Sequence, residues 1–502
     1  MSEAAQKEWF GHPRGLSTLF FTELWERLSY YGMRAILVLF MVDALQNGGF
    51  GLTDGKAAAI YGLYTAGVYL LSLPGGWMAD RLIGQQQAVF WGGVVIAAGH
   101  FTMALPLIPG LEGLTSLSFF LGLILIVIGT GLLKPNVSAV VGELYPEKGA
   151  KRDAGFSLFY MGINIGAFAG PLICGYLGED VDWHLGFSAA GFGMLIGLVQ
   201  YKMGLKYLGD AGTLRDVTPE TLKRDWGRFY AASGAILGTC VLLYVLRDSL
   251  GITLEGMAQV TGVIIVGLAI VYFGYILAAG GLNQTEKKRV VVIFLLFVGA
   301  AMFWSGFEQA GSSMNLFAER HTNRMVGDWE APASWLQSVN PLFIIIFAPI
   351  FGWLWVALGS REPSIPFKFG MGLLLLGSGF MVMAWGSTYI PDSPNGVSPM
   401  WLIVTYFLHT AGELCLSPVG LSSVTKLSPR RLVGQMMGTW FMGAALGNLI
   451  AGLVAGRIES MPLPNLFGTV ATIVMVAGAL YILFTIPIKK LIGDLKADEA
   501  ES

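Results

Sequence analysis

Charge is scarce in this chain. Only 13% of its 502 residues are Asp, Glu, Lys or Arg, whereas 54% are hydrophobic and the mean hydropathy is +0.63. Soluble globular domains carry about 25% charged residues. This shortage excludes an ordinary soluble protein. Together with the long apolar runs, it predicts an all-α integral membrane protein embedded in a lipid bilayer.

Residues that support covalent or metal chemistry are also few. The three cysteines, Cys174, Cys240 and Cys415, lie in apolar segments without paired spacing, and the five histidines form no HExxH pattern. We therefore expect no disulfide framework, no metal site, no catalytic residues and no enzymatic activity. No basic run is interleaved with aromatic residues, which argues against a nucleic-acid partner.

The apolar runs predict about fourteen membrane-spanning helices, because each needs about 20 mostly apolar residues. They lie at 17–45, 57–79, 88–107, 115–142, 153–176, 185–205, 229–247, 256–281, 290–317, 334–358, 367–389, 399–425, 432–456 and 465–488. No small-residue cleavage site follows the first run, so we expect that helix to stay in the protein. The expected domains are a six-helix bundle (1–205), a cytoplasmic linker (206–228), two additional helices (229–281) and a second six-helix bundle (290–490).

Basic residues indicate the orientation. An even number of spans puts both termini on one side, and the segments on that side hold 23 of the 31 Lys and Arg residues. Five lie on the other side and three lie within spans. By the positive-inside rule both termini are cytoplasmic. In the linker, Thr218 followed by Pro219 and Glu220 favours a short helix on the membrane surface.

The first span, TELWERLSYYGMRAILVLF, carries four charged side chains, although one charge near the bilayer centre costs about 2.5–3.5 kcal/mol. A helical projection puts five polar side chains within about 60° of Glu23; they are Glu23, Glu26, Arg27, Tyr30 and Arg34. Such a face cannot contact lipid. It is either a structural ion-pair network that fixes helix packing, or a transport pathway in which two carboxylates beside one arginine respond to protonation.

Two more polar residues lie within later spans of the first half. Lys134, in the fourth span, precedes Pro135, which removes a backbone donor. This lysine needs an acidic partner, which the first span offers, unless it snorkels to the end of its own span. Asn164 in the fifth span either bonds a neighbouring helix or contacts substrate, and the surrounding glycines favour close helix packing.

The second half supplies acidic residues. Glu308 and Glu413 lie mid-span, and Ser417 follows Glu413 by one turn. Asn340 stands at a helix start as a cap or a ligand contact, and Trp440 serves packing or binding. Cations in the first half and anions in the second could form salt bridges that break as the halves rock. Such a cavity also suits a zwitterion.

These residues resemble the signatures of the proton-dependent oligopeptide transporter family, within the major facilitator superfamily. The ExxERxxYYG signature is matched from Glu23 to Gly32, and FYxxINxG from Phe159 to Gly166. The fourth-helix lysine before proline, the seventh-helix Glu-Gln and the tenth-helix Glu-Leu-x-x-Ser-Pro are matched at Lys134, Glu308 and Glu413. The extra helix pair resembles that of bacterial members.

Two departures qualify the resemblance. The superfamily's Gly-Asp-Arg loop is present around Asp80, but Gln85, Gln86 and Gln87 stand where basic residues are common, which puts its gating contribution in doubt. The second span has no histidine, unlike animal members, so protonation should fall on carboxylates. The proton-coupling candidates are accordingly Glu23, Glu26, Arg27 and Glu308.

The resemblance implies a major facilitator fold in the bacterial inner membrane and proton-driven import of di- and tripeptides, with the proton as coupling ion and no cofactor. It implies an outer gate between Arg34 and Glu308 and an inner gate between Lys134 and Glu413. The implied peptide-binding residues are Tyr31, Arg34, Tyr69, Lys134, Asn164, Glu308, Asn340, Glu413, Ser417 and Trp440. The peptide carboxylate would meet the cations, and its amine would meet Glu413 and the two asparagines.

Other functions remain open at this point. The same fold could carry nitrate, a glucoside or a drug-like compound, or the protein could sense peptides without transporting them. A lone anion would gain nothing from Glu413 in the site, which argues against nitrate. Competition of labelled dipeptide uptake separates the cargoes, and flux in proteoliposomes separates a carrier from a sensor.

Overall fold

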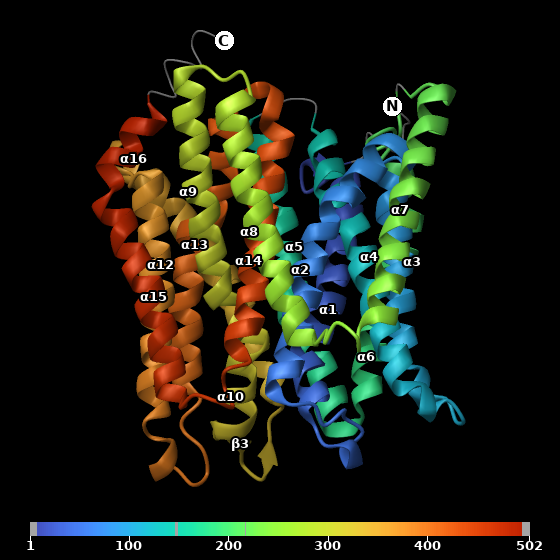
Figure 1. Cartoon of the computed structure of the whole chain (residues 1–502), viewed down its shortest axis with the longest axis vertical. Coiled ribbons are helices and arrows are strands. Elements are labelled where there is room, and N and C mark those ends of the chain that lie inside the picture. Colours follow the sequence, from blue (N-terminus) through green and yellow to red (C-terminus); the bar gives the residue numbers. More distant parts are fainter. Residues whose placement is uncertain (1–7, 146–148, 216, 494–502) are drawn as a thin grey trace. The chain divides into compact units, whose positions relative to one another are not determined.

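The computed structural model describes residues 8–145, 149–215 and 217–493, and these form an almost wholly helical protein (Figure 1). In chain order the helices are α1 (Gly15–Val42), α2 (Asp54–Met78), α3 (Gln85–Met103), α4 (Thr115–Glu143), α5 (Ala150–Gly175), α6 (Trp183–Gly204), α7 (Pro219–Leu246), α8 (Leu254–Ala279), α9 (Gln284–Phe307), α10 (Ser313–His321), α11 (Val339–Leu358), α12 (Ile365–Ser387), α13 (Met400–Leu427), α14 (Val433–Ala455), α15 (Leu463–Leu483) and α16 (Thr485–Ile492). Two small hairpins pair β1 (Glu8–Trp9) with β2 (His12–Pro13), and β3 (Met325–Val326) with β4 (Trp329–Glu330).

Eleven helical stretches in the described part of the chain are long and apolar enough to cross a membrane. The three other predicted spans also form helices: α1, α3 and α6 have 28, 19 and 22 residues. A helix of about 20 residues covers the hydrocarbon core, so every predicted span corresponds to a helix of sufficient length. The all-α membrane fold is confirmed.

Contacts divide the chain into two units. The first comprises Met1–Ile36 and Gly67–Met257, and the second comprises Leu37–Ala66 and Ala258–Ser502. The ends of α1 and α2 that flank their connecting loop therefore group with the second unit, although the rest of both helices belongs to the first. Asp54, at the start of α2, illustrates this grouping: its carboxylate accepts two hydrogen bonds from Arg320 of α10, at 2.6 and 2.8 Å.

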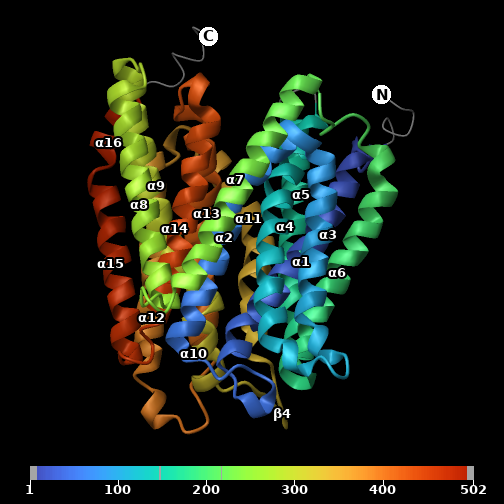
Figure 2. The same ribbon diagram turned by 45° about the vertical axis from the view of Figure 1, so that its right-hand side comes forward.

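The first unit is held together by close helix contacts. In Figure 2, α3 runs beside α4, and its contacts with both α4 and α6 are extensive. α1 lies so close to α5 that a Cβ atom on Gly166 would stand 2.1 Å from the carbonyl oxygen of Leu24. Any larger residue at Gly166 would force these helices apart. The glycines of the fifth span therefore do permit the close packing that the sequence predicted, and they fix the polar face of α1 within its bundle.

The second unit uses the same packing principle. α12 packs along α13 and α15, and α9 packs along α14. A Cβ atom on Gly447 of α14 would meet the Cβ atom of Trp304 on α9 at 2.6 Å. Within the span Gln284–His321, the α-helix changes to a short 3-10 turn at η8 (Glu308–Gly311) before α10 resumes. This break sits at a predicted site residue.

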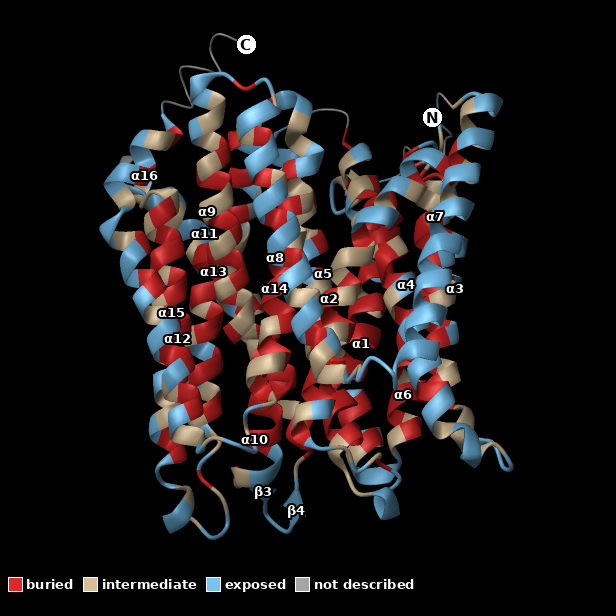
Figure 3. Ribbon diagram, in the orientation of Figure 1, coloured by how far each residue is buried: buried red, intermediate tan, exposed pale blue. Residues whose placement is uncertain are grey.

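The linker differs from the prediction. Thr218 does cap a helix, since its hydroxyl accepts a hydrogen bond from the backbone N–H of Thr221 at 3.3 Å. The helix is not a short surface element, however, because α7 continues without a break from Pro219 into the apolar run. The local cap and proline signals mark where a helix begins but carry no information about where it ends. Figure 3 shows α7 exposed along most of its length, as expected for a helix that contacts lipid.

Candidate functional site

The polar stripe of α1 forms a buried ion network in the first unit. Arg27 Nε lies 2.7 Å from Glu23 Oε1 and 2.8 Å from Glu26 Oε2. The two carboxylate residues are 2% and 1% exposed. One guanidinium thus serves two buried carboxylates. Among the described residues, Glu23 Oε1 accepts a hydrogen bond from Arg27 Nε, whereas neither oxygen of Glu26 has a hydrogen-bond partner. Glu26 therefore has fewer protein donors than Glu23.

The predicted cations of this unit share one arrangement, because each lies over a tyrosine ring. The guanidinium carbon of Arg34 is 5.1 Å from the centroid of Tyr31, and that of Arg27 is 5.7 Å from Tyr30. Lys134 Nζ, on α4, is only 3.8 Å from the centroid of Tyr69 on α2. Cation–π contact stabilises a cation. Each of the three tyrosine rings therefore stabilises a positive charge inside this unit.

Lys134 also interacts electrostatically with Glu26. This interaction favours an acidic partner on the first span over a lysine that snorkels to the end of its own span. For Asn164, contact with substrate stays a prediction, and the hydrogen bond that the structure gives lies within its own helix. Its Nδ2 donates to the carbonyl oxygen of Tyr160 on its own helix, at 2.9 Å, and it is buried.

In the second unit, Asn340 and Glu413 are brought together. Asn340 Nδ2 donates to Thr410 Oγ1 at 2.8 Å and lies 3.4 Å from Glu413 Oε2. Asn340 is therefore not a helix cap: α11 begins at Val339 with Ser338 in the cap position, and the amide reaches across to α13 instead. Ser417, one turn beyond Glu413, is half-buried.

Glu308 is buried at the first residue of the η8 turn, where α9 ends. Its backbone carbonyl accepts a hydrogen bond from the Tyr61 hydroxyl at 3.3 Å. Trp440 is also buried, and a Cβ atom on Gly420 would stand 2.0 Å from its ring. The Trp440 ring thus packs tightly against Gly420 of α13, about two turns along that helix from Glu413.

Two residues of this neighbourhood were missing from the predicted site. Thr410 accepts the hydrogen bond of Asn340, and its only sequence signal is its position three residues before Glu413. Trp304 precedes Glu308 by one helical turn, and its Nε1 is buried without a hydrogen-bond partner among the described residues. Since a buried indole N–H usually finds a partner, Trp304 is a candidate to donate to substrate.

Each predicted gate pair joins a residue of one unit to a residue of the other. Arg34 and Lys134 belong to the first unit, whereas Glu308 and Glu413 belong to the second. The two gate pairings, Arg34 with Glu308 and Lys134 with Glu413, therefore stay predictions. Among the described residues, no group of three His, Cys, Asp or Glu side chains is arranged to hold a metal ion.

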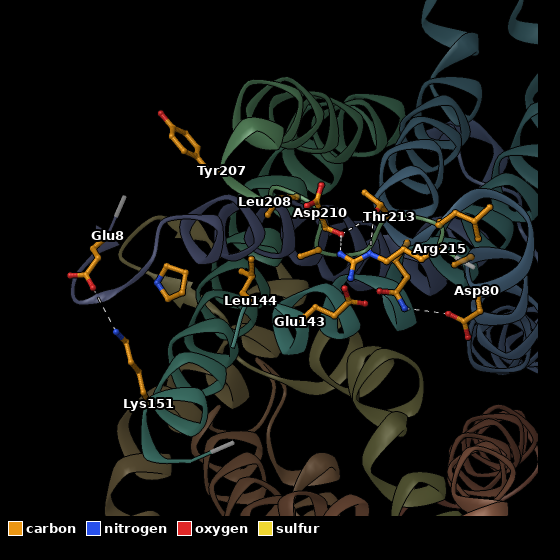
Figure 4. A pocket seen from close by; sticks show the side chains of 16 residues that line it. Glu8, Asp80, Glu143, Leu144, Lys151, Tyr207, Leu208, Asp210, Thr213 and Arg215 are labelled. Carbon is orange, nitrogen blue, oxygen red and sulfur yellow. Dashed lines mark hydrogen bonds and ion pairs between the residues drawn. The ribbon is translucent and has the colours of Figure 1, made fainter. Parts of the chain in front are cut away.

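A cavity of about 860 Å³ lies elsewhere, at the end of the first unit where α1 begins. Figure 4 shows its lining, which includes Asp80, Glu143, Asp210 and Arg215 and none of the predicted site residues. Gln85 lines this cavity, and its Nε2 donates to Asp80 Oδ1 at 3.2 Å. Gln86 Nε2 donates to the carbonyls of Gly209 and Ala211 at 3.0 and 2.7 Å, so Gln86 holds this part of the linker.

The chain is similar to known membrane transporters along most of its length. Residues 86–469 match the POT family. The chain is 40% identical to the peptide transporter YePEPT of Yersinia enterocolitica, with 98% of each chain covered. It is 36% identical to the di-/tripeptide transporter of Lactococcus lactis subsp. cremoris, over 98% of this chain and 99% of that one. A crystal structure of a peptide transporter POT in complex with sulfate superposes with a TM-score of 0.89 at 42% identity, covering 97% of this chain and 98% of that chain.

Proposed function

This chain belongs to the POT family, and we propose that it is a symporter that imports di- and tripeptides together with protons by alternating access. Its relatives named as peptide and di-/tripeptide transporters support the substrate class. The observation that carries the mechanism is the network of Glu23, Glu26 and Arg27. We propose no enzymatic activity and no cofactor, with the proton as the coupling ion.

The network suits proton coupling for an electrostatic reason. Glu23 and Glu26 share the single guanidinium of Arg27, Glu26 also interacts with Lys134, and the three residues of the network are buried. A proton on one carboxylate removes one negative charge and leaves Arg27 to the other carboxylate. Protonation therefore changes which ion pair exists. A transporter needs such a change to link proton movement to its conformational cycle.

The remaining polar residues suit a zwitterion. Arg34 and Lys134, each over a tyrosine ring, would receive the peptide carboxylate. Glu413, beside the amide of Asn340, would receive the peptide amine. We retain the gate pairings Arg34–Glu308 and Lys134–Glu413 as part of this proposal, together with pocket roles for Tyr31, Tyr69, Asn164, Ser417 and Trp440.

The experiment is dipeptide uptake into proteoliposomes with an imposed pH gradient. Proton-driven uptake is measured as accumulation of a labelled dipeptide inside the proteoliposomes when the outside is acidic. We expect uphill uptake that collapses when a protonophore removes the gradient. Uptake that is unchanged by the protonophore would exclude coupling, and an absence of any flux would indicate a sensor. Stronger competition by nitrate or a glucoside than by unlabelled dipeptide would reassign the cargo.

We also propose the bacterial inner membrane as the location, with both termini cytoplasmic. The asymmetry of 23 basic residues on one side against five on the other supports this orientation. A reporter that fluoresces only in the cytoplasm should be bright when fused after Ser502. A folded but dark fusion would contradict the orientation and the even number of spans.

A further inference from the structure

The N-terminal hairpin contains an unusual residue at its tip. β1 and β2 are joined by Phe10 and Gly11, whose φ angles are +49° and +75°. A two-residue turn of type I′ requires positive φ at both central positions and therefore favours Asn or Gly there. Bulky residues rarely adopt positive φ. Phe10 does so while its side chain is 82% exposed, so packing within the protein does not explain this residue.

The hairpin lies against a part of α1 that is open to its surroundings. The Trp9 ring centroid is 5.5 Å from that of Phe20 and 6.4 Å from that of Phe21. Phe21 is 39% exposed. It stands between the α1 residues that contact α5, such as Phe20 against Gly162, and those that contact α6, such as Trp25 against Gly197. Phe21 thus lies on an exposed side of a predicted membrane-spanning helix, and aromatic residues near the ends of such helices are enriched at the membrane–water interface.

Positive charge gathers beside the hairpin. The Arg14 guanidinium carbon and Lys206 Nζ lie 5.0 and 5.2 Å from the Tyr207 ring centroid. Lys206 is exposed, and Arg14 Nε is buried without a hydrogen-bond partner among the described residues. Arg14 also immediately precedes α1, whose first backbone N–H groups add partial positive charge. In Figure 4 the Tyr207 ring points away from the cavity residues.

The ionisation of Tyr207 reports the same positive potential. Partial desolvation acts to raise the pKa of Tyr207, but the nearby positive charges of Lys206 and Arg14 lower its pKa overall. The nearby acidic residue Glu8 does not offset this charge, since it lies 3.7 Å from Lys151 and pairs with that lysine. The surface thus presents two cations beside an interfacial tyrosine and a protruding apolar ring.

We propose that Arg14, Lys206 and Tyr207 bind the phosphate of one anionic glycerophospholipid, while Phe10 inserts among the headgroups and upper acyl chains beside it. Charge complementarity selects a lipid of net negative charge over a zwitterionic one. The exposed ring in a disfavoured backbone conformation supports a lipid rather than free phosphate as the ligand, because only a lipid offers an apolar region for it. This site is independent of peptide transport and requires only that the protein resides in a membrane.

Native mass spectrometry of the purified full-length protein, titrated with phosphatidylglycerol, tests the proposal. We expect the first phosphatidylglycerol molecule to bind more tightly than any further phosphatidylglycerol molecules and more tightly than phosphatidylcholine. Arg14→Gln with Lys206→Gln should weaken that binding by roughly tenfold or more, since each basic residue near the surface contributes about 1 kcal/mol. The matched control is Lys287→Gln with Lys288→Gln, which removes two basic residues from the start of α9. Equal weakening by both double variants would overturn the site.

A second variant tests the role of the Phe10 ring and separates a loss of lipid binding from a folding defect. Phe10→Asn places a residue favoured in a type I′ turn, so it should keep or raise thermal stability in detergent while weakening phosphatidylglycerol binding several-fold. Unchanged lipid affinity in Phe10→Asn would remove the ring from the site. A third arm adds inorganic phosphate: phosphate that displaces the tight phosphatidylglycerol at millimolar concentration would show a plain anion site and overturn the lipid assignment.

Discussion

The carboxylates of α1 and of α13 have different hydrogen-bond donors beside them. On α1, Glu23 and Glu26 contact a full positive charge, Arg27, at 2.7 and 2.8 Å. On α13, Glu413 lies 3.4 Å from the neutral amide of Asn340. A neutral donor stabilises a carboxylate without cancelling its charge, whereas an arginine shared by two acids makes their net charge depend on a proton. From this difference we propose that the α1 carboxylates respond to protons and that Glu413 on α13 recognises a charged group of the substrate.

The largest expected effect tests the α1 side of this comparison. Glu26→Gln fixes that side chain in a neutral form, so the network can no longer change its charge with pH. Uphill dipeptide accumulation under a pH gradient should fall to background, while counterflow between equal peptide pools persists because no proton movement is needed. Glu23→Gln should behave in the same way.

The control for this prediction is Glu112→Gln, which alters an exposed carboxylate in the short η5 turn (Glu112–Leu114). It should accumulate peptide as the unaltered protein does. Full accumulation by both Glu23→Gln and Glu26→Gln would show that the α1 carboxylates do not couple transport to protons. Glu308 would then be the leading candidate for the coupling role.

The next largest effect tests the α13 side through the substrate. N-acetylation removes the peptide's positive charge, and C-amidation removes its negative charge. Loss of one partner from a buried charge pair costs several kcal/mol, and a hydrated cavity lowers that cost. We therefore expect each blocked dipeptide to compete at least about tenfold more weakly than the free dipeptide in the uptake assay.

Two variants make this test specific. Glu413→Ala should reduce the difference in competition between the free and the acetylated dipeptide. The weaker competition by the amidated dipeptide should remain. Arg34→Ala should do the reverse, so each variant is the control for the other. Blocked peptides that compete as well as the free one would show that the site does not read the termini, and the assignments of Arg34, Lys134 and Glu413 would be wrong.

The sequence predicted the features that follow from periodicity and hydropathy. The α1 stripe is one example, because a helical repeat alone puts Glu23, Glu26 and Arg27 on one face. The helix positions are another. The length of α7 was not predictable in this way, since the signals at Thr218 and Pro219 describe a start only.

Contacts between helices were beyond sequence reasoning for a different reason. The hydrogen bond from Asn340 to Thr410 joins residues 70 positions apart, and no local pattern indicates which face of α11 meets α13. The same holds for Lys134 above the Tyr69 ring. Such pairs depend on how closely helices approach, which is set by glycines such as Gly166 and not by the polar residues themselves.

A smaller effect is expected for the cation–π contact at Lys134. Tyr69→Leu removes the ring 3.8 Å from its ammonium group, and such contacts contribute about 0.5–2 kcal/mol. Dipeptide affinity in the competition assay should therefore fall by roughly 2- to 30-fold. Tyr69→Phe keeps the ring and should retain most of the affinity. An equal loss in Tyr69→Phe would assign the effect to the hydroxyl group instead.

The smallest effect concerns Thr410, which supports the α13 side without a charge. Its hydroxyl donates to the carbonyl of Tyr406 at 2.7 Å and accepts from Asn340 at 2.8 Å. Thr410→Val has nearly the same shape but leaves the amide of Asn340 without this acceptor. One net hydrogen bond contributes about 0.5–1.5 kcal/mol, or roughly 2- to 10-fold in peptide affinity.

Thr410→Ser is the matched control, because it keeps the hydroxyl group and should preserve affinity. If Thr410 acts by orienting Asn340 toward Glu413, its effect requires Glu413. In the Glu413→Ala background, Thr410→Val should therefore add little further loss for the free dipeptide, since residues of one network are not additive. A full, additive loss in that background, or an equal loss in Thr410→Ser, would show that Thr410 affects packing alone. In that case the position of Glu413 would be set by α13 and not by the amide of Asn340.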